Sequence, residues 1–338
     1  MATIGTGVTY LDLASRLGPD NKVAAIIEML TKTNEILKDA VTVEGNLPIG
    51  HKSVIRTGLP TATWRLLNYG VQPSKSTTAQ VTDTCGMLEA YAEVDKSLAD
   101  LNGNSGAFRL SEDRAFLEAM NQEMATVLFY GNQSVDQEKF TGLKARYGSV
   151  SSSTATSIGY NLVPAIAHGS ISGDDTTSIW FVTWGENTTH LIYPKGSQAG
   201  FQHQDLGEVT LTDSATPAGR YQGYRTHYKW DLGLCVRDWR YNVRVGNIDI
   251  STLDAAPKTA IDLFGAMTDA YYKIPNTNMG KTVIYCNQKV LSYLQKQAAE
   301  AGKYMLTWDK PVGGPVLNFM GLPIRRCDAI LNTDGEIT

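Results

Sequence analysis

One segment, residues 41–80, constrains the fold of this chain more than any other. Short β-prone pieces alternate there with turn-forming residues, which are Gly45, Pro48, Gly50, Gly58, Pro60, Gly70 and Pro73. The apolar residues between the turns are too sparse to close a core, and irregular stretches of this length are uncommon inside compact domains unless they are functional. We therefore expect this segment to lean on another part of the chain or on another molecule.

The clearest regular element is a helix predicted over residues 111–130. Ser111 is a suitable N-cap, and Gly131 is placed to end the helix. Apolar residues at helical spacing form one stripe: Phe116, Leu117, Met120, Met124, Val127 and Leu128. Residues 11–40 have a similar but weaker pattern, which predicts one or two amphipathic helices.

Residues 178–250 are predicted to form strands. In RTHYKWDLGLCV, which ends at Val236, apolar and polar residues alternate as expected for a strand. The alternation changes phase near Arg237, which indicates a bulge or turn.

The last third of the chain alternates helix and strand. A helix is predicted with Pro257 in a first-turn position, and a second helix follows the cap Asn287. Strands are predicted for KTVIYC and on either side of Gly321, so the whole chain is assigned to the α+β class.

Charge and composition exclude several classes of protein. The net charge of −4 argues against binding nucleic acid through overall charge. We expect no secretory signal and no membrane span, because the N-terminus is not basic and no apolar run is long enough. Four cysteines, namely Cys85, Cys235, Cys286 and Cys327, are scattered singly, so neither a disulfide framework nor a structural zinc site is predicted.

Two sets of residues resemble the parts of a cysteine hydrolase. His227, Asp231 and Cys235 share a strand face, but four residues of extended chain span about 13 Å, far beyond hydrogen-bonding reach. Cys327 follows Arg325 and Arg326, whose charges would lower a thiol pKa, although no histidine lies in the last hundred residues to act as a base.

No cofactor or metal site is predicted either. The five histidines (His51, His168, His190, His203 and His227) lack helical i, i+4 or HxH spacing. Asp174 and Asp175 fit a turn better than a pair of catalytic acids, and no glycine pattern predicts a phosphate cradle. A chain without a visible site, but with a segment that cannot fold alone, is expected to contact copies of itself.

Two long runs carry a resemblance to a known family. They are RTGLPTATWRLLNYGVQPSKSTTAQVTDTCGMLEAYAEVD and SIWFVTWGENTTHLIYPKGSQAGFQHQDLG, the second continued by THYKWDLGLCVRDWRYNVRVGNID. They resemble the major capsid proteins of short-tailed and related tailed bacteriophages, over nearly the whole chain.

The resemblance implies a tailed-phage major capsid fold with four parts. These would be an N-terminal arm (1–40), an extended loop (41–82), a peripheral domain (83–250) with a spine helix at 111–130, and an axial domain (251–331). The strand GLPIRR would belong to the axial domain, with its arginines as packing or contact residues. Because this strand and the helix before it follow the long strands here, the resemblance also implies a permuted element order.

The implied function is structural. Subunits would assemble into the hexamers and pentamers of an icosahedral shell, without cofactor or membrane, around DNA contacted nonspecifically. Scaffolding, portal and possible cement proteins would be partners, and the chain would be made in the host cytoplasm and reside in the virion. Two alternatives stay open: a cysteine-dependent hydrolase using Cys327 or Cys235, and a β-rich binding module of a virion or tail.

Contact residues are predicted in the extended loop. Large aromatic residues concentrate binding energy at interfaces, and Gly58-Leu59-Pro60 stiffens the approach to Trp64. The predicted interface residues are Ile55, Leu59, Trp64 and Leu66.

Overall fold

The computed structural model describes residues 32–101, 105–150, 157–167, 171, 175–212, 219–256, 261–299, 306–309 and 316–337. Predictions for residues 1–31, which make up most of the arm, and for His168, Asp174 and Pro257 lie outside these ranges. The chain forms two compact units. The first comprises the described parts of Met1–Lys32, Met87–Ala125 and Gln198–Asp231, and the second those of Thr33–Gly86, Thr126–Ser197 and Leu232–Thr338.

The second unit is built on a mixed sheet around strand β5 (Thr176–Trp184). This strand lies antiparallel to β9 (Val243–Asp249) on one side and to β10 (Lys281–Cys286) on the other. From β10 the sheet continues through parallel β13 (Leu322–Arg326) to antiparallel β12 (Val316–Phe319) and β11 (Leu306–Asp309).

Shorter strands complete the same unit. Strand β4 (Leu162–Pro164) pairs in parallel with β9. Strand β6 (Thr189–Tyr193) joins β5 by one parallel bridge, pairs in parallel with β1 (Thr42–Glu44), and lies antiparallel to the end of β8 (Arg220–Val236).

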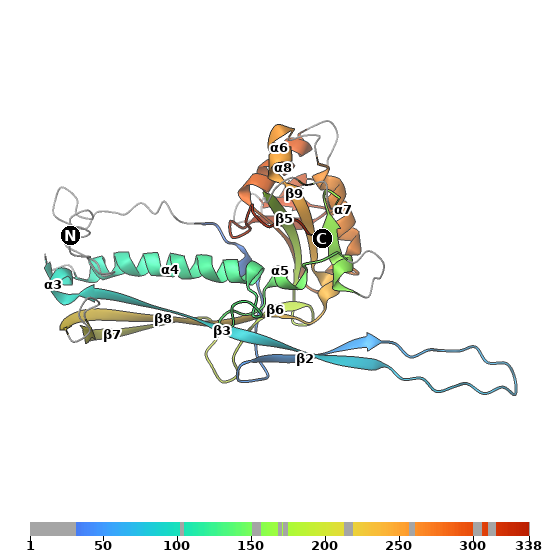
Figure 1. Cartoon of the computed structure of the whole chain (residues 1–338), viewed down its shortest axis with the longest axis horizontal. Helices are drawn as coiled ribbons and strands as arrows, with labels where there is room; N and C mark the ends of the chain where they lie inside the picture. Colours follow the sequence, from blue (N-terminus) through green and yellow to red (C-terminus); the bar gives the residue numbers. More distant parts are fainter. Residues whose placement is uncertain are drawn as a thin grey trace. The chain divides into compact units, whose positions relative to one another are not determined.

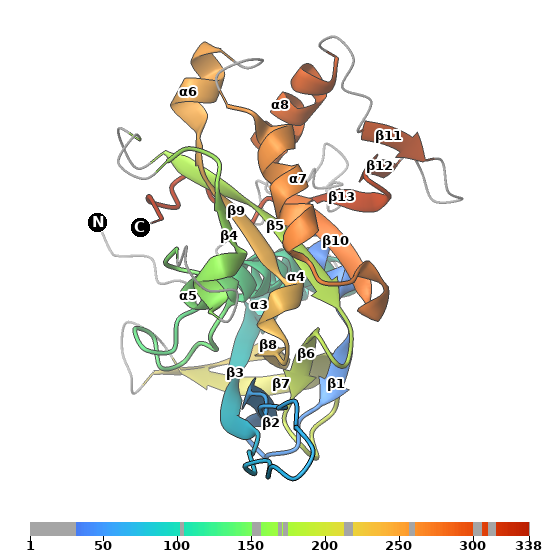
Figure 2. The same cartoon turned by 90° about the vertical axis from the view of Figure 1, so that its right-hand side faces the viewer.

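The core of the second unit lies on both faces of β5, since all nine of its residues are buried. Ile179 and Phe181 face the apolar sides of α7 (Leu263–Lys273) and α8 (Gln288–Ala298), which pack on one face of the sheet (Figure 2). On the other face, the ring of Trp180 lies 6.0 Å from that of Phe129. A strand covered on both sides is expected to be apolar or uncharged throughout, as TTSIWFVTW is.

Local signals place the helices of this unit correctly. Asn287 caps α8, and its side chain accepts a hydrogen bond from the Val290 backbone N–H at 2.9 Å, as predicted. The predicted strands around Gly321 are β12 and β13, joined by a tight turn in which Met320 and Gly321 both have positive φ. The turn predicted near Arg237 follows the end of β8, where the 3-10 helix η3 (Trp239–Tyr241) begins shortly afterwards.

The first unit contains parts of β3 (Thr77–Asp95) and β8, helix α3 (Lys96–Ala99), most of α4 (Ser105–Tyr130) and strand β7 (Phe201–Thr212). Strands β7 and β8 form an antiparallel hairpin with a bulge between Asp205 and Gly207. This unit contains two small cores, one of Ala92, Met120 and Tyr228 and another of Val94, Leu98, Ala99 and Phe108. The Arg109–Asp205 ion pair, 2.6 Å long, joins α4 to β7.

The predicted spine helix is longer than expected. It begins at Ser105 rather than at Ser111, and it ends at Tyr130, as Gly131 predicted. The N-cap assignment of Ser111 is wrong because its Oγ donates a hydrogen bond to the Phe108 carbonyl at 2.7 Å, inside the helix. Leu117, assigned to the apolar stripe, is 40% exposed because the buried face follows Met120, Met124 and Leu128.

The compact units do not follow the domain boundaries predicted from the sequence. Residues 83–250 are divided between both units, and residues 126–197 and 232–250 cluster with 251–331. The physical reason is the backbone ladder, because β5 and β9 pair with each other and β5 pairs with β10, which lies about a hundred residues later.

The remaining described elements are short: α2 (Ile36–Asp39), α5 (Leu143–Arg146), η2 (Ile158–Asn161), α6 (Ile250–Ala255) and η4 (Thr277–Met279). Among the described residues, no helix has the length and apolar character needed to cross a bilayer.

Candidate assembly interface

A two-stranded ribbon carries the predicted contact residues. Strand β2 (Gly50–Gly58) pairs antiparallel with the first part of β3, from Gly50 opposite Thr84 to Gly58 opposite Thr77. Residues 59–76 connect the two strands without regular structure, and Figure 1 shows this connection as a long blue loop beyond the ends of β2 and β3. This part of the predicted extended loop is therefore held as two strands by backbone pairing.

The connection exposes large apolar side chains. Every residue from 59 to 80 is exposed, and the exposed fraction is 104% for Trp64, 79% for Leu59 and 73% for Leu66. Leu67, Tyr69 and Val71 are also exposed. Of the four predicted contact residues only Ile55, within β2, is half-buried. Single exposed apolar residues are ordinary, whereas larger exposed apolar surfaces are typical of interaction sites.

The base of the ribbon, in contrast, is firmly held. Asp83 of β3 and Arg146 of α5 form a 2.7 Å ion pair in which the carboxylate side chain is only 3% exposed. The Asn46 side chain makes two 2.7 Å hydrogen bonds with the backbone of Lys52. At Gly50 a Cβ would lie 2.1 Å from the Asp83 carbonyl oxygen, so only glycine permits this close approach. The ribbon thus has a fixed base and an exposed tip.

The structure provides no activated thiol at Cys327. Its side chain is fully buried, and burial raises its pKa to about 12. The neighbouring guanidiniums have other partners, because Arg325 pairs with Glu35 and Asp39, and Arg326 pairs with Asp328. A nucleophilic thiolate is therefore disfavoured at the site where the sequence offered one.

The constellation of His227, Asp231 and Cys235 also has no triad geometry. His227 stacks on the Tyr91 ring, 4.5 Å between centroids, and its Nε2 lies 3.2 Å from the Glu89 carboxylate. Asp231 pairs with Lys229 at 3.3 Å. Cys235 is fully buried, and burial raises its pKa far above the ordinary thiol range. The three side chains therefore have separate partners, as expected from their spacing along one strand.

Thiol labelling provides a direct check. In the folded chain at pH 8, we expect an alkylating reagent to modify Cys85 and to leave Cys235, Cys286 and Cys327 unmodified, since only Cys85 is partly exposed. Raised pKa values act in the same direction, because they reduce the thiolate fraction at any given pH. Mass spectrometry would locate the label, and the chain unfolded in urea should react at all four thiols. Rapid labelling of folded Cys327 would contradict this assignment.

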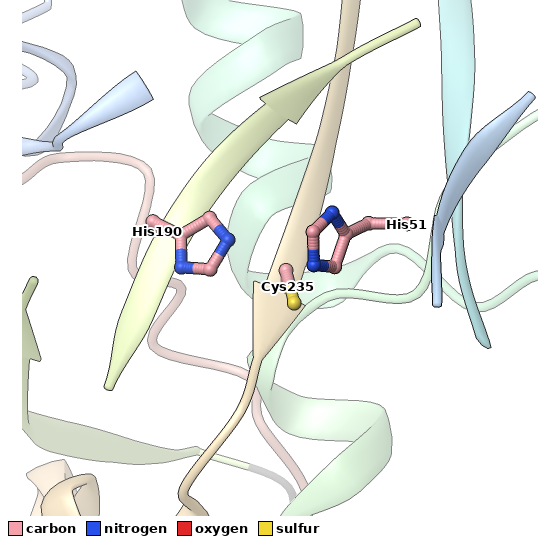
Figure 3. Close-up of side chains that lie close together, drawn as sticks. All are labelled: His51, His190 and Cys235. Carbon is pink, nitrogen blue, oxygen red and sulfur yellow. The ribbon is translucent and has the colours of Figure 1, made fainter. Parts of the chain in front are cut away.

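A second cluster lies in the second unit, near the base of the ribbon. His51 of β2, His190 of β6 and Cys235 of β8 point toward one another (Figure 3). One candidate ligand atom from each residue lies within 4.8 Å of the other two. His190 and Cys235 are directly opposite in the β6–β8 ladder, and the rings of His51 and His190 meet edge to face at 5.7 Å.

The imidazoles of this cluster are neutral at neutral pH. Burial, assisted by His51 and Arg237, lowers the pKa of His190 to about 4. Burial and Arg237 also lower the pKa of His51, while Asp83 opposes the shift. Within the described part of the chain, neither ring nitrogen of His190 nor Nδ1 of His51 has a hydrogen-bond partner. The Gly185 backbone opposes this shift and raises the pKa of His190.

Sequence reasoning missed this cluster for a geometric reason. Its members are separated by 139 and 45 positions. His190 and Cys235 meet because β6 and β8 pair in that register, and His51 comes from β2, which pairs with β3. Searches for i, i+4 or HxH spacing detect ligands on a single element. The sequence offers one signal that could have helped to find the cluster. His190 in THLIY and Cys235 in LGLCV have apolar neighbours, which favours buried strands at both positions.

Comparisons with known proteins agree with the capsid resemblance. The sequence profile of the family described as "Major capsid protein GP7" matches residues 18–338. A solved structure of bacteriophage epsilon15 is similar with 37% sequence identity and a TM-score of 0.80, covering 100% of this chain and 100% of that chain.

Other solved capsids are more distant. The bacteriophage JBD30 capsid has 9% identity and a TM-score of 0.45, covering 89% of this chain and 93% of its own. The capsid of a native GTA particle has 12% identity and the same TM-score, with coverage of 66% and 93%. No curated protein sequence matches the chain. The profile and the epsilon15 structure support an assignment to the family.

Proposed function

We propose that the β2–β3 ribbon binds an adjacent subunit in a capsid shell. The chain belongs to the family of the major capsid protein GP7, and it is a shell-forming subunit with the tailed-phage capsid fold. The observation that carries the proposal is the run of exposed apolar side chains at residues 59–71. Apolar surface in water is unfavourable by roughly 25 cal/mol per Å², so covering these side chains favours association.

Trp64 is the proposed anchor of this contact, and Leu59, Leu66 and Ile55 surround it. A fully exposed indole has the largest apolar area to lose on binding, and tryptophan is among the residues enriched at energetic centres of interfaces. Ile55 supports the ribbon side of the contact, because it faces Ala79 across the β2–β3 ladder and stays half-buried. Polar neighbours such as Gln72 would form the rim.

The proposed roles of the other parts follow the resemblance. Residues 1–40 would be the arm, 41–82 the extended loop, 83–250 the peripheral domain, and 251–331 the axial domain around which pentamers and hexamers form. The separate compact unit formed by 87–125 and 198–231 supports a distinct role for part of the peripheral region. The permuted element order is supported by β7 and β8 preceding β10, α8 and β13.

The proposed partners are first of all other copies of this chain, and then scaffolding, portal and possibly cement proteins. Packaged DNA would be contacted without sequence preference, because exposed basic residues such as Lys38 and Arg114 are thinly spread. Synthesis in the host cytoplasm and a purely structural, non-enzymatic role complete the proposal. Cys235 and Cys327, the candidate nucleophiles, are buried and have raised pKa values, which supports the structural role over a cysteine hydrolase.

Amide hydrogen exchange tests the proposed contact. In free subunits, residues 59–76 should exchange fast, since no strand ladder protects them. In assembled particles the same amides should exchange at least tenfold more slowly, because a neighbour covers them. Strand β5 is the internal control, since its amides are buried in both states. Equal exchange of residues 41–80 in the two states would reject the proposed contact.

A further inference from the structure

We propose that His51, His190 and Cys235 bind a thiophilic transition-metal cation, with Zn²⁺ as the ion that best suits the donor set. Two imidazole nitrogens and one sulfur match the ligands that Zn²⁺ takes in proteins, whereas Mg²⁺ and Ca²⁺ prefer oxygen. The proposal does not depend on how subunits contact one another, because all three residues belong to the second compact unit.

The distances are close to those of a bound ion. Ligand atoms at 2.0–2.3 Å from a tetrahedral zinc lie about 3.5 Å apart. The present limit of 4.8 Å therefore requires an inward movement of about 1 Å, which side-chain rotation can supply. His190 and Cys235 are held on opposite strands of one ladder, and only the half-buried His51 must follow.

The unpartnered nitrogens point to a missing ligand. Buried polar groups in folded proteins nearly always have a hydrogen-bond partner, and an exception calls for an explanation such as an ion or a water. His190 is 1% exposed, with both ring nitrogens unpartnered among the described residues.

The local charges are mixed. Asp83 adds negative charge beside Cys235, which favours a cation, whereas Arg237 adds positive charge, which opposes one. The Asp83 charge is partly neutralised by its 2.7 Å pair with Arg146. As the metal–sulfur bond forms, the Cys235 thiol loses its proton to solvent, so the bound site gains one positive charge overall. A solvent molecule entering beside half-buried His51 would complete a tetrahedron.

The consequence for the protein is mechanical. The three ligands come from β2, β6 and β8, so a bound ion would fasten the base of the ribbon to the sheet of the same unit. A ligand that binds only the folded chain raises its thermal stability by mass action. The ion would thus stiffen the base from which the exposed tip extends.

Metal titration of the full-length chain tests the site. Subunits treated with a chelator and dialysed would be titrated with Zn²⁺, and bound metal measured by elemental analysis. We expect one ion per chain and a higher melting temperature. With Co²⁺ as a probe, we expect a sulfur-to-metal charge-transfer band. Chelator-treated, folded chains that fail to bind Zn²⁺ stoichiometrically would overturn the proposal without any variant.

Variants identify the ligands. Cys235→Ser should remove the cobalt charge-transfer band, and His51→Gln, at a half-buried position, should weaken Zn²⁺ binding at least tenfold. The matched controls are Cys327→Ser, another buried thiol, and His203→Gln, an exposed histidine, and both should bind metal as the unaltered chain does. A charge-transfer band that survives in folded Cys235→Ser, or equal weakening by His203→Gln, would assign the metal elsewhere.

Discussion

Replacing Trp64 by alanine is expected to leave the free subunit folded while weakening each intersubunit contact by ~2 kcal/mol, about thirtyfold in affinity. The side chain is fully exposed in the single chain, so its removal takes nothing from the core. In the shell the same side chain is proposed to fill a site on a neighbour. Because every subunit repeats the contact, the concentration needed for assembly should rise steeply.

The measurement compares assembly with folding. Sedimentation and electron microscopy would give the assembled fraction against subunit concentration, and thermal unfolding of free subunits should change by no more than about 0.5 kcal/mol. Gln72→Ala is the matched control, because it truncates an exposed residue of the same segment without removing an aromatic ring. Normal assembly of Trp64→Ala, or an equal defect in Gln72→Ala, would show that the indole is no anchor.

Replacing Arg244 by methionine is expected to destabilise the folded subunit by ~3–5 kcal/mol, since the buried Asp334 carboxylate loses its buried charge partner and keeps only the partly exposed Lys144 ammonium at 3.5 Å. The side chains of Arg244 and Asp334 are both 1% exposed and form a 3.0 Å ion pair. The guanidinium also donates to Ser178 Oγ at 3.0 Å and to the Tyr147 carbonyl at 2.9 Å. Breaking one pair therefore disturbs a network that joins β9, β5 and the segment near residue 334.

Urea unfolding of the free subunit would measure this loss. The control is Arg240→Met, the same substitution in a nearby ion pair with Asp238, where the arginine side chain is 54% exposed. Exposed pairs contribute about 0–1 kcal/mol, so this variant should remain near the unaltered stability. Adding Asp334→Asn to Arg244→Met should recover part of the lost stability, because it removes the buried carboxylate charge that has lost its guanidinium partner. Equal losses for the two arginine variants would show that burial of the pair has no special weight.

The elements that the sequence predicted well depend on interactions between neighbouring residues. A glycine that ends a helix, an asparagine that caps one, and two-residue alternation act over a few neighbouring residues. The end of α4 at Tyr130, the start of α8 after Asn287 and the end of β8 at Val236 could therefore be predicted from the sequence alone. The prediction that the helix starts at Ser111 was wrong. A serine inside a helix can donate its hydroxyl to a carbonyl of the preceding turn, as Ser111 does to Phe108, so a serine alone does not mark an N-cap. The apolar residues of segment 59–71 are exposed, which agrees with the expectation that the apolar residues of 41–80 are too sparse to close a core of their own.

Only the tertiary structure decided which distant strands pair. The choice depends on register across the whole sheet and on the entropy of closing long loops, neither of which is encoded in a short window. Pairing of β5 with β9 and β10 divided residues 83–250 between two compact units. Tertiary packing also placed Arg244 of β9 against Asp334, and it brought His51, His190 and Cys235 together from β2, β6 and β8. The sequence by itself therefore determined the family, most local elements and the lack of a core in segment 59–71, whereas the tertiary structure decided the units, the buried ion pair and the candidate metal ligands.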